Sequence, residues 1–350
     1  MAGNSFGQIF KITTFGESHG DGVGVVIDGC PSEIPLSPKD FVYDMARRRP
    51  GKHRLESPRK EKDQVNILSG VFQDKTTGTP ITLFIQNRDV DSRPYDVLQD
   101  VFRPGHADFS YFKKYGHFDY RGGGRYSARE TAARVAAGVV AGKILEPLGI
   151  GVVAYTLELG GIRAAHEDLK AIGENILCCP DPAAAKLMEE AVSRAKKDGD
   201  SLGGIAEIKV TGCPPGLGEP VFDKLDAELA KALMSVGAVK GVEIGAGFEA
   251  ARLRGSENND PIDPQGFRSN NAGGILGGIS NGDEIVVRVA MKPIPSILLK
   301  QDTVDRKGRS AKLEFAGRSD ISAIPRVIPI LEAMVKVVLV DHILRSRAVT

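Results

Sequence analysis

The sequence predicts an α+β fold built from two related halves. Five runs rich in valine, isoleucine and threonine have the composition and length of β-strands, and they alternate irregularly with helix signals. A pattern of strand, Gly-Cys-Pro, loop and helix also occurs twice along the chain. At 350 residues the chain is long enough to bury a full core. We therefore expect one interlocked domain over residues 1–350.

The strands and helices are placed by residue type. The predicted strands cover residues 23–28, 80–86, 152–159, 205–211 and 284–291. Helix starts are marked by a polar capping residue followed by proline or by acidic side chains. These predicted starts are Ser37-Pro38 with Asp40, Asp181-Pro182, Asp223 with Asp226, and the segment that follows Pro329.

The repeated pattern covers residues 22–48 and 203–232. Each copy contains a strand, the tripeptide Gly-Cys-Pro, a proline-containing loop and a capped helix. Chance could supply a shared tripeptide, but the agreement in element order favours a duplication. The two copies would then pack as pseudosymmetric halves.

Charge and hydropathy exclude several classes of protein. The formal charge is only +1, so no overall field attracts nucleic acid or an anionic membrane. Glu332 and Lys336 interrupt the most apolar stretch, and no run reaches the roughly 18–20 apolar residues of a membrane span. The first residues do not read as a signal peptide, so we expect a cytoplasmic protein. The cysteines lack zinc-site spacing, and no metal is expected.

The segment RGGGRYSARETAARVAAG, residues 121–138, carries the strongest local signal. Ser127 and Glu130 have capping-box spacing, which predicts an alanine-rich helix from there to Pro147. Three glycines before the cap leave backbone amides accessible, and Arg125 and Arg129 add two cations. A well-capped core helix alone would not require RGGGR. We therefore favour an anion or cofactor site, although neither a P-loop nor a GxGxxG fingerprint is present.

Residues 47–62, RRRPGKHRLESPRKEK, form a dense basic segment. It is open to three interpretations: a solvated loop, a nucleic-acid backbone contact, or a clamp for a small anionic substrate. No aromatic residue lies between the charges, which argues against nucleic acid. Arg48 and Arg54 are the candidates for the clamp, because arginine binds carboxylate and phosphate in bidentate fashion.

Two histidines lie in polar, glycine-containing segments: His19 in GESHGD and His106 in RPGHAD, near Arg103. A lone histidine is more often structural than catalytic, but an imidazole can donate a proton near neutral pH. Asp320, in GRSDISAIP, and the extended segment KPIPSI at 292–297 add further polar groups. Together these segments predict a site assembled from distant parts of the chain around a planar, phosphate-bearing ligand.

These motifs resemble those of the chorismate synthases. The segments FGESHGDGVGVVIDGCP, RPGHAD, GGGRYSARETAARVAAG, KPIPSI and GRSDISAIPRVIP occur in the order and spacing of that family. The resemblance implies a β-α-β sandwich with a helical layer between two antiparallel sheets, an internal repeat and a homotetramer. It also implies a lyase that converts 5-enolpyruvylshikimate 3-phosphate to chorismate and phosphate by trans-1,4-elimination, using reduced FMN. This reaction is the last step of the shikimate pathway, which leads to the aromatic amino acids.

The resemblance also implies residue roles. His19 would be the acid for the departing phosphate, and His106 would protonate or stabilise the anionic reduced flavin. Asp320, helped by Ser127 and Ser18, would manage the proton at flavin N5. The expected flavin contacts are Arg125, Tyr126, Ser127, Gly237, Ala238, Gly277, Lys292, Pro293, Ile294, Pro295, Ser296 and Arg318. The expected substrate or NADP contacts are Arg48, Arg54, Arg103 and Arg129.

Partners and alternatives follow from the same comparison. No reductase domain is visible, so we expect a separate flavin reductase system and at most an indirect role for NADPH. A flavin-dependent oxidoreductase that uses the same site for net hydride transfer is the alternative enzyme. An RNA-binding module built on residues 47–62 is the non-enzymatic alternative. Tyr126 departs from the family pattern, which often has serine there.

Overall fold

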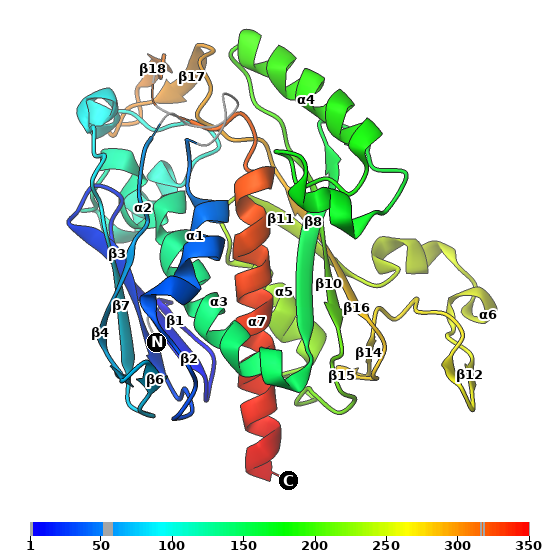
Figure 1. Ribbon diagram of the computed structural model, residues 1–350. Helices are drawn as coiled ribbons and strands as arrows, with labels where there is room; N and C mark the ends of the chain where they lie inside the picture. Colours follow the sequence, from blue (N-terminus) through cyan, green and yellow to red (C-terminus); the bar gives the residue numbers. More distant parts are fainter. Residues whose placement is uncertain (1–2, 52–58, 316, 318, 350) are drawn as a thin grey trace.

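The computed structural model describes residues 3–51, 59–315, 317 and 319–349. A layer of helices lies between two five-stranded antiparallel sheets (Figure 1), which confirms the α+β sandwich. In order across the first sheet, the strands are β1 (Ser5–Phe6), β2 (Lys11–Gly16), β3 (Gly22–Asp28), β7 (Ile81–Gln86) and β4 (Val65–Ser69). In order across the second sheet, they are β11 (Val239–Ile244), β16 (Ile285–Met291), β10 (Gly204–Thr211), β8 (Gly151–Leu159) and β9 (Ile162–Arg163).

The helices divide into an inner and an outer set. The inner layer consists of α1 (Val42–Arg48), α3 (Thr131–Leu145), α5 (Leu225–Met234) and α7 (Ile324–Val349). Outside it lie α2 (Asp108–Tyr115), α4 (Pro182–Lys197) and α6 (Gly255–Asn258). Short 3-10 turns are η1 (Pro38–Phe41), η2 (Arg93–Gln99), η3 (Arg121–Tyr126), η4 (Ala128–Glu130), η5 (Glu146–Leu148), η6 (Leu169–Gly173) and η7 (Gly247–Arg252). Small hairpins are β5 (Val71–Phe72) with β6 (Lys75–Thr76), β12 (Ile262–Asp263) with β13 (Gly266–Phe267), β14 (Ile275–Leu276) with β15 (Ile279–Ser280), and β17 (Gln301–Val304) with β18 (Ser310–Leu313).

The two long helices α3 and α7 cross at the centre of the layer. All residues of α3 except Arg134, Gly142 and Lys143 are buried, as expected for a helix with sheets and helices around it. The crossing is close because Gly138 has no side chain: a Cβ there would lie 2.5 Å from Ala333 Cα. One apolar core runs from Phe10 to Ile343 and includes residues of both sheets.

The topology supports the internal repeat. In chain order, β2, β3, α1, β4, β7 and α3 of the first half correspond to β8, β10, α5, β11, β16 and α7 of the second. The sheets match as well, because the order β2-β3-β7-β4 has the same connectivity as β8-β10-β16-β11. The repeated unit therefore extends beyond the segments that were similar in sequence.

The two Gly-Cys-Pro turns are also equivalent in their hydrogen bonds. The Thr76 hydroxyl donates to the Pro31 carbonyl at 2.6 Å and accepts from the Ile34 amide at 3.0 Å. In the second copy the Ser280 hydroxyl donates to the Pro214 carbonyl at 2.6 Å and accepts from the Leu217 amide at 2.9 Å. A buried hydroxyl thus satisfies the turn in the same way in both halves.

All five predicted strands are present, and two of the predicted helix starts are correct. Ser37 forms a capping box with Asp40, although the first turn is the 3-10 turn η1, and Asp181 accepts hydrogen bonds from two amides at the start of α4. Asp223 is not a cap: its carboxylate accepts hydrogen bonds from Gln8 and Arg345, and α5 begins one residue after Lys224. The sequence reading missed β2, β4 and β11, which carry polar residues or glycine among their apolar ones.

The final helix begins earlier than predicted. It starts at Ile324 and continues through Pro329, which removes one backbone donor near the start of the helix. The buried Glu332 carboxylate in this helix accepts hydrogen bonds from Arg47 Nη1 at 2.5 Å and from Arg47 Nη2 at 2.9 Å. It also accepts one from the Ala154 amide at 3.0 Å. The helices of the described chain include none that is both long enough and apolar enough to cross a membrane.

Candidate active site

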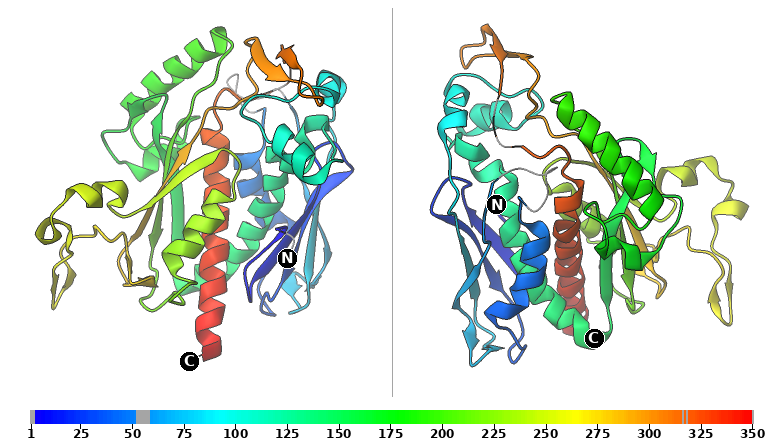
Figure 2. Two further views of the ribbon diagram at one scale, coloured as in Figure 1. Left: turned by 180° about the vertical axis from the view of Figure 1, so that it is seen from behind. Right: turned by 45° about the horizontal axis from the view of Figure 1, so that its top comes forward.

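The predicted site segments meet at the end of the helical layer where α7 begins, at the top of Figure 1. They are the GESHGD loop between β2 and β3, the RPGHAD turn before α2, the RGGGRYS segment in η3 and η4, and the residues before α7. When this end is turned forward, α4 and the β17–β18 hairpin rise on opposite sides of it (Figure 2, right). The fold therefore brings together segments separated by up to about 300 positions in the sequence.

His19 is held in one orientation by two neighbours. It is buried, its Nδ1 lies 2.8 Å from Ser92 Oγ, and its ring meets the Tyr95 ring edge-on with centroids 5.2 Å apart. Ser92 and Tyr95 belong to the start of η2. The imidazole lies in a turn and is oriented there by Ser92 and Tyr95.

Ser18 links the His19 loop to two other segments. Its amide donates to the Gly124 carbonyl at 3.1 Å, and its hydroxyl accepts from Arg59 Nη1 at 3.0 Å. Ser18 is buried, so these bonds hold the histidine loop between the glycine segment and an arginine.

The RGGGRY segment contacts both histidines, His19 through Gly122 and His106 through the Tyr126 ring. Gly122, Gly123 and Gly124 all have positive φ angles, of 58°, 81° and 50°, which residues with a side chain rarely adopt. A Cβ on Gly122 would overlap the His19 ring, while one on Gly123 would lie 3.5 Å from the Tyr126 ring. The backbone conformation therefore favours glycine at all three positions, and the close approach of His19 also requires it at Gly122.

The capping box predicted for the next helix forms only in part. Ser127 caps η4 by accepting a hydrogen bond from the Arg129 amide at 3.3 Å. Glu130 does not reach back: its carboxylate accepts from the Thr14 hydroxyl at 2.9 Å and from Arg134 Nε at 2.9 Å. The start of α3 is thus already faced by a protein carboxylate, and an anion would depend on the glycines and on arginines instead.

His106 lies in a buried hydrogen-bonded cluster around Asp108. Its Nδ1 is 3.1 Å from Asp108 Oδ1, and the same oxygen accepts from the Tyr126 hydroxyl at 2.9 Å. Arg103 donates to both carboxylate oxygens, Nε to Oδ2 and Nη2 to Oδ1, each at 2.8 Å. Burial lowers the pKa of His106, and the hydrogen bond to Asp108 works in the opposite direction.

The KPIPSI segment packs beside this cluster. Lys292 Nζ donates to the Gly105 carbonyl, and Arg103 Nη1 donates to Ser296 Oγ at 3.3 Å. The Lys292 amide donates to the Ala238 carbonyl at 2.9 Å, which brings residues 237–238 to the same place. The Ile294 carbonyl, in contrast, is occupied by the Ser201 hydroxyl at 2.7 Å.

A cluster of buried arginines lies next to the His19 loop. Arg48 and Arg129 approach opposite oxygens of Asp63, the former at 3.7 Å. Arg129 Nε also donates to Asn87 Oδ1 at 2.8 Å, and the Asn87 amide donates to the Glu17 and Gly20 carbonyls of the GESHGD loop. The cluster is therefore connected to His19 through the backbone of its own loop.

Arg48 has unused hydrogen-bonding capacity. Its side chain is 1% exposed, yet Nε and Nη1 have no hydrogen-bond partner among the described residues. Burial and three neighbouring arginines lower the pKa of Arg48, and Asp63 opposes them. Buried donors without acceptors are costly, and an anion bound here would supply the acceptors. At the start of α7, Arg326 donates to the Arg48 carbonyl at 3.2 Å and forms an ion pair with Asp320.

Several expected contacts are not brought together. Arg125 turns toward β2, where it donates to the Thr14 carbonyl at 2.9 Å. Gly277 lies in the β14–β15 hairpin, near the opposite end of the second sheet (Figure 1). Arg54 and Arg318 lie outside the described residues.

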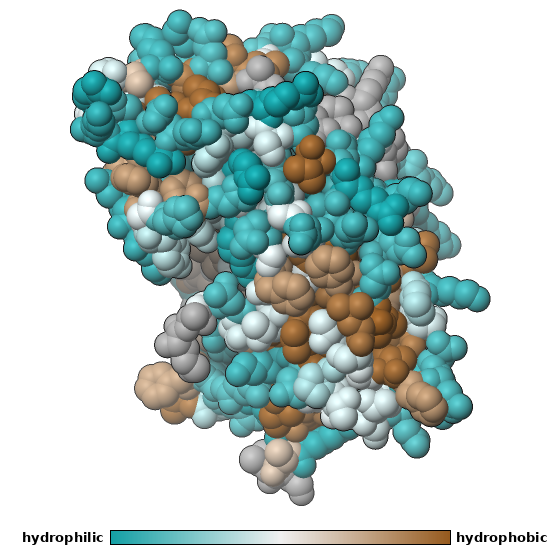
Figure 3. All heavy atoms as spheres, turned by 90° about the vertical axis from the view of Figure 1, so that its left-hand side faces the viewer, coloured by the Kyte–Doolittle hydropathy of each residue, from teal (hydrophilic) through white to brown (hydrophobic). Residues whose placement is uncertain are grey.

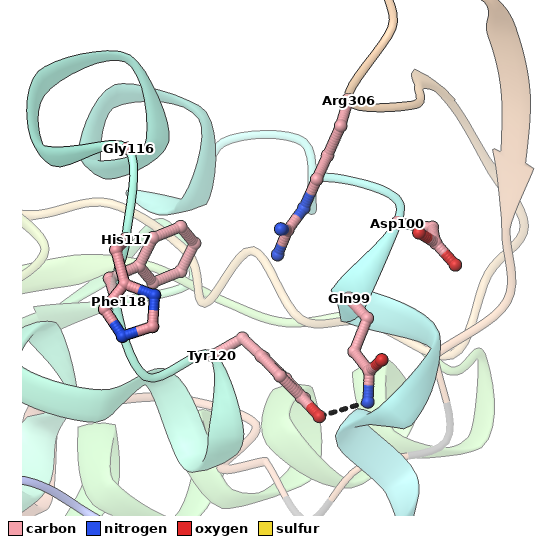
Figure 4. A pocket seen from close by; sticks show the side chains of 7 residues that line it. All are labelled: Gln99, Asp100, Gly116, His117, Phe118, Tyr120 and Arg306. Carbon is pink, nitrogen blue, oxygen red and sulfur yellow. Dashed lines mark hydrogen bonds between the residues drawn. The ribbon is translucent and has the colours of Figure 1, made fainter.

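A shallow hollow opens beside η3 (Figure 4). Its volume is about 280 Å³, and its lining consists of Gln99, Asp100, Gly116, His117, Phe118, Tyr120 and Arg306. Arg306 points into it, and the Gln99 amide donates to the Tyr120 hydroxyl across it. Most of these side chains are exposed, and none is a buried polar group without a partner, so the hollow does not define a ligand.

Sequence reasoning missed the residues that hold the candidate groups in place. Asp108, Asp63, Asn87 and Arg59 were not singled out, although Asp108 lies within RPGHAD and Arg59 within the basic segment. Asp108 lies two positions from His106 and five from Arg103, so its place in the motif could have signalled it. The other three are bonded to Ser18 or Arg129, 41 to 66 positions away, and only the folded chain identifies them. No three histidine, cysteine or acidic side chains gather as a metal site in the part of the chain that the structure describes.

Comparison with known proteins identifies the family. The family model described as chorismate synthase matches residues 10–344. The chorismate synthase of Desulfatibacillum aliphaticivorans is 58% identical over 349 residues, covering 100% of this chain and 98% of that protein. The chorismate synthase of Syntrophobacter fumaroxidans is 59% identical over 349 residues, covering 100% and 99%. A crystal structure of a chorismate synthase has a TM-score of 0.78 and 34% identity, covering 97% of this chain and 93% of that one. This chain therefore belongs to the chorismate synthase family of lyases.

Proposed function

We propose that this protein converts 5-enolpyruvylshikimate 3-phosphate to chorismate and phosphate by trans-1,4-elimination, with reduced FMN as cofactor. The observation that carries the proposal is that two oriented histidines contact the RGGGRY segment, His19 at Gly122 and His106 at the Tyr126 ring. Each histidine is held through Nδ1 by a neighbouring oxygen. A site with two oriented imidazoles suits a reaction in which a phosphate leaves and a ring proton is removed.

The arginine cluster matches the charge of such a substrate. Arg48, Arg129 and Arg59 lie close to the His19 loop, and the carboxylates of Asp63 and Glu61 neutralise only part of their charge. Two carboxylates and a phosphate would supply the acceptors that the Arg48 guanidinium lacks. Arginine binds such groups in bidentate fashion, and burial strengthens each ion pair.

The leaving phosphate needs a proton donor. His19 is the group in place for this role, because Ser92 fixes its Nδ1 and leaves Nε2 on the side that faces Gly122. Arg59, bonded to the neighbouring Ser18, would help to bind the phosphate. Asp320 and Ser127 remain the proposed groups for the proton at the cofactor.

The residues around His106 fit a flavin. Gly123 lets the backbone approach a ligand closely, and the Tyr126 ring next to His106 offers an aromatic face. The KPIPSI segment adds extended backbone, and Lys292 within it adds a cation. Reduced FMN, when bound, would supply transient electron density to the substrate and recover it after phosphate departs. Within this chain, Arg103, Lys292 and His106 would stabilise the negative charge of the reduced ring. Gly277 would contact the flavin only if the Gly277 in question belonged to another subunit of the tetramer.

A homotetramer is part of the proposal, and the outer face of the first sheet supports it. Apolar residues gather on the lower half of this face (Figure 3). Phe15 and Phe84 lie on it opposite Gly24 of β3, and each ring covers a glycine of that strand. An apolar sheet face of this kind is typical of a contact between copies of a chain.

The proposal also includes one domain over residues 1–350, a cytoplasmic location, a separate flavin reductase and at most an indirect role for NADPH.

The test is anaerobic incubation of the protein with reduced FMN and 5-enolpyruvylshikimate 3-phosphate. We expect chorismate and phosphate to form in equal amounts while the flavin stays reduced. Stoichiometric oxidation of the flavin would support the oxidoreductase alternative instead. Salt-dependent RNA binding without any flavin affinity would overturn the proposal.

A further inference from the structure

Asp108 is the common partner of three side chains that line the proposed flavin site. It is the first residue of α2 and is 3% exposed. Arg103 contacts both of its oxygens through the side chain and one of them through the amide, at 3.0 Å. The Tyr126 hydroxyl and His106 Nδ1 share Oδ1, at 2.9 and 3.1 Å. No other carboxylate among the described residues contacts His106.

The charge of Asp108 decides where the His106 proton lies. Burial would raise the pKa of the Asp108 carboxyl, but the hydrogen bonds from Arg103 and His106 and the charge of Arg103 hold it well below its usual range. The carboxylate is therefore ionised and can only accept hydrogen bonds. Because Nδ1 of His106 is within hydrogen-bond distance of it, Nδ1 must carry the proton.

We propose that Asp108 is a positioning residue that fixes His106 as the Nδ1–H tautomer, so that Nε2 is the atom that exchanges a proton next to the bound ligand. This inference rests on the proposed function, in which His106 faces the flavin. The role resembles that of a buried aspartate that orients a catalytic histidine from behind. Asp108 itself does not touch the reacting atoms.

The surroundings of His106 predict when Nε2 gains a proton. The charged and titratable groups that face the ring are Asp108, Arg103, Lys292 and Tyr126. Burial and the two cations favour the neutral ring while no anion is bound. An anionic ligand would offset these cations, and Nε2 would take up a proton from solvent. The resulting imidazolium would be stabilised through Nδ1 by Asp108.

The tautomer can be measured directly by ¹⁵N NMR of histidine-labelled protein, with His106→Gln to assign the signal. We expect a protonated Nδ1 and a bare Nε2 in the wild-type protein near pH 7.5. In Asp108→Asn the amide can donate to Nδ1, and the Nε2–H form should become populated. Asp108→Glu keeps a carboxylate and should retain the Nδ1–H form. An Nε2–H tautomer in the wild-type protein, or no change in Asp108→Asn, would overturn the inference.

Kinetics supply the second readout. Asp108→Asn should lower kcat on the order of 10²-fold with little change in the substrate KM, and proton uptake on binding reduced FMN should fall. Asp263→Asn is the matched control, because Asp263 also holds an arginine and an amide, on a distant hairpin. Asp263→Asn should leave kcat and the proton uptake unchanged.

If the wild-type protein forms no chorismate, the proposed function fails, while the NMR result still decides the role of Asp108. If Asp108→Asn does not fold, the wild-type tautomer alone decides it.

Discussion

The imidazole of His19 packs directly on the backbone of Gly122. A Cβ on Gly122 would overlap the ring and lie 2.8 Å from Ser18 Oγ. Gly122→Ala should therefore push His19 away from Ser92 and lower kcat on the order of 10²-fold, because a proton donor must stay within hydrogen-bond reach. Steady-state assays with reduced FMN would measure this loss.

Gly161→Ala is the control for backbone strain. Gly161 also has a positive φ, 80°, but nothing lies within 4 Å of the position of its Cβ. Both variants should lose roughly 1–2 kcal/mol of unfolding free energy because both force a side chain into the left-handed region. Gly122→Ala should lose more than this in total, because its Cβ also overlaps the His19 ring. Equal activity in the two variants would show that the Gly122 contact does not position His19.

His106→Ala should lower turnover strongly without unfolding the protein. The ring lies in a turn, and its loss leaves Asp108 with Arg103 and Tyr126 as donors. We expect a fall in kcat on the order of 10²-fold or more, with a thermal midpoint close to that of the wild type. His117→Ala, at an exposed histidine in the nearby hollow, is the matched variant. If both variants keep full activity, His106 has no role in the reaction.

Local sequence signals predicted the strands better than the site. Runs such as VGVVID and EIVVRVAM are buried on at least one face, so composition alone identified β3 and β16. β2 was missed because KITTFG has only two large apolar residues, Ile12 and Phe15, and they do not form an alternating pattern. Asp223 was misassigned because a cap and a distant ion-pair partner have the same residue type. The hydrogen bonds at the two Gly-Cys-Pro turns involve Thr76 and Ser280, which lie 45 and 66 positions after their prolines.

The roles of the candidate site residues stay predictions, and the residues that support them could not be predicted from the sequence. His19, His106 and Arg48 occur in motifs that can be read locally. Asp63 shows why its supporting residues could not be predicted: in the sequence it is one of five consecutive charged residues, RKEKD, and it lies between two buried arginines only after folding. Glu332 was read only as an interruption of an apolar run, yet it binds Arg47 in the core.

Glu332→Gln should strongly destabilise the fold. The substitution leaves the Arg47 guanidinium without its buried countercharge, and Glu332 also accepts from the Ala154 amide of the second sheet. Breaking one side of a fully buried ion pair costs about 3–5 kcal/mol. The loss here should lie toward the lower end, because the Arg47 side chain is 23% exposed and keeps Asp44 at 3.3 Å. Urea unfolding would measure the loss. Glu249→Gln, which removes an exposed pair with Arg252, should cost less than about 1 kcal/mol. Similar losses in the two variants would contradict the buried-pair assignment.

His342 should make the fold less stable in mild acid. It is 1% exposed in α7, and neither ring nitrogen has a hydrogen-bond partner among the described residues. Burial, followed by the charge of Arg345, lowers the pKa of His342 in the folded state, whereas in the unfolded chain it is about 6.5. Between these two values the unfolded chain binds more protons, so stability must fall as pH decreases from about 7.5 through 6.5 toward the folded pKa. The slope of unfolding free energy against pH from this one group is at most about 1.4 kcal/mol per pH unit.

Urea unfolding across this pH range should show a shallower pH dependence of stability in His342→Phe than in the wild type. The control His166→Asn, at an exposed position, should keep the wild-type slope. Equal slopes in all three proteins would mean that His342 does not set the acid sensitivity of the fold.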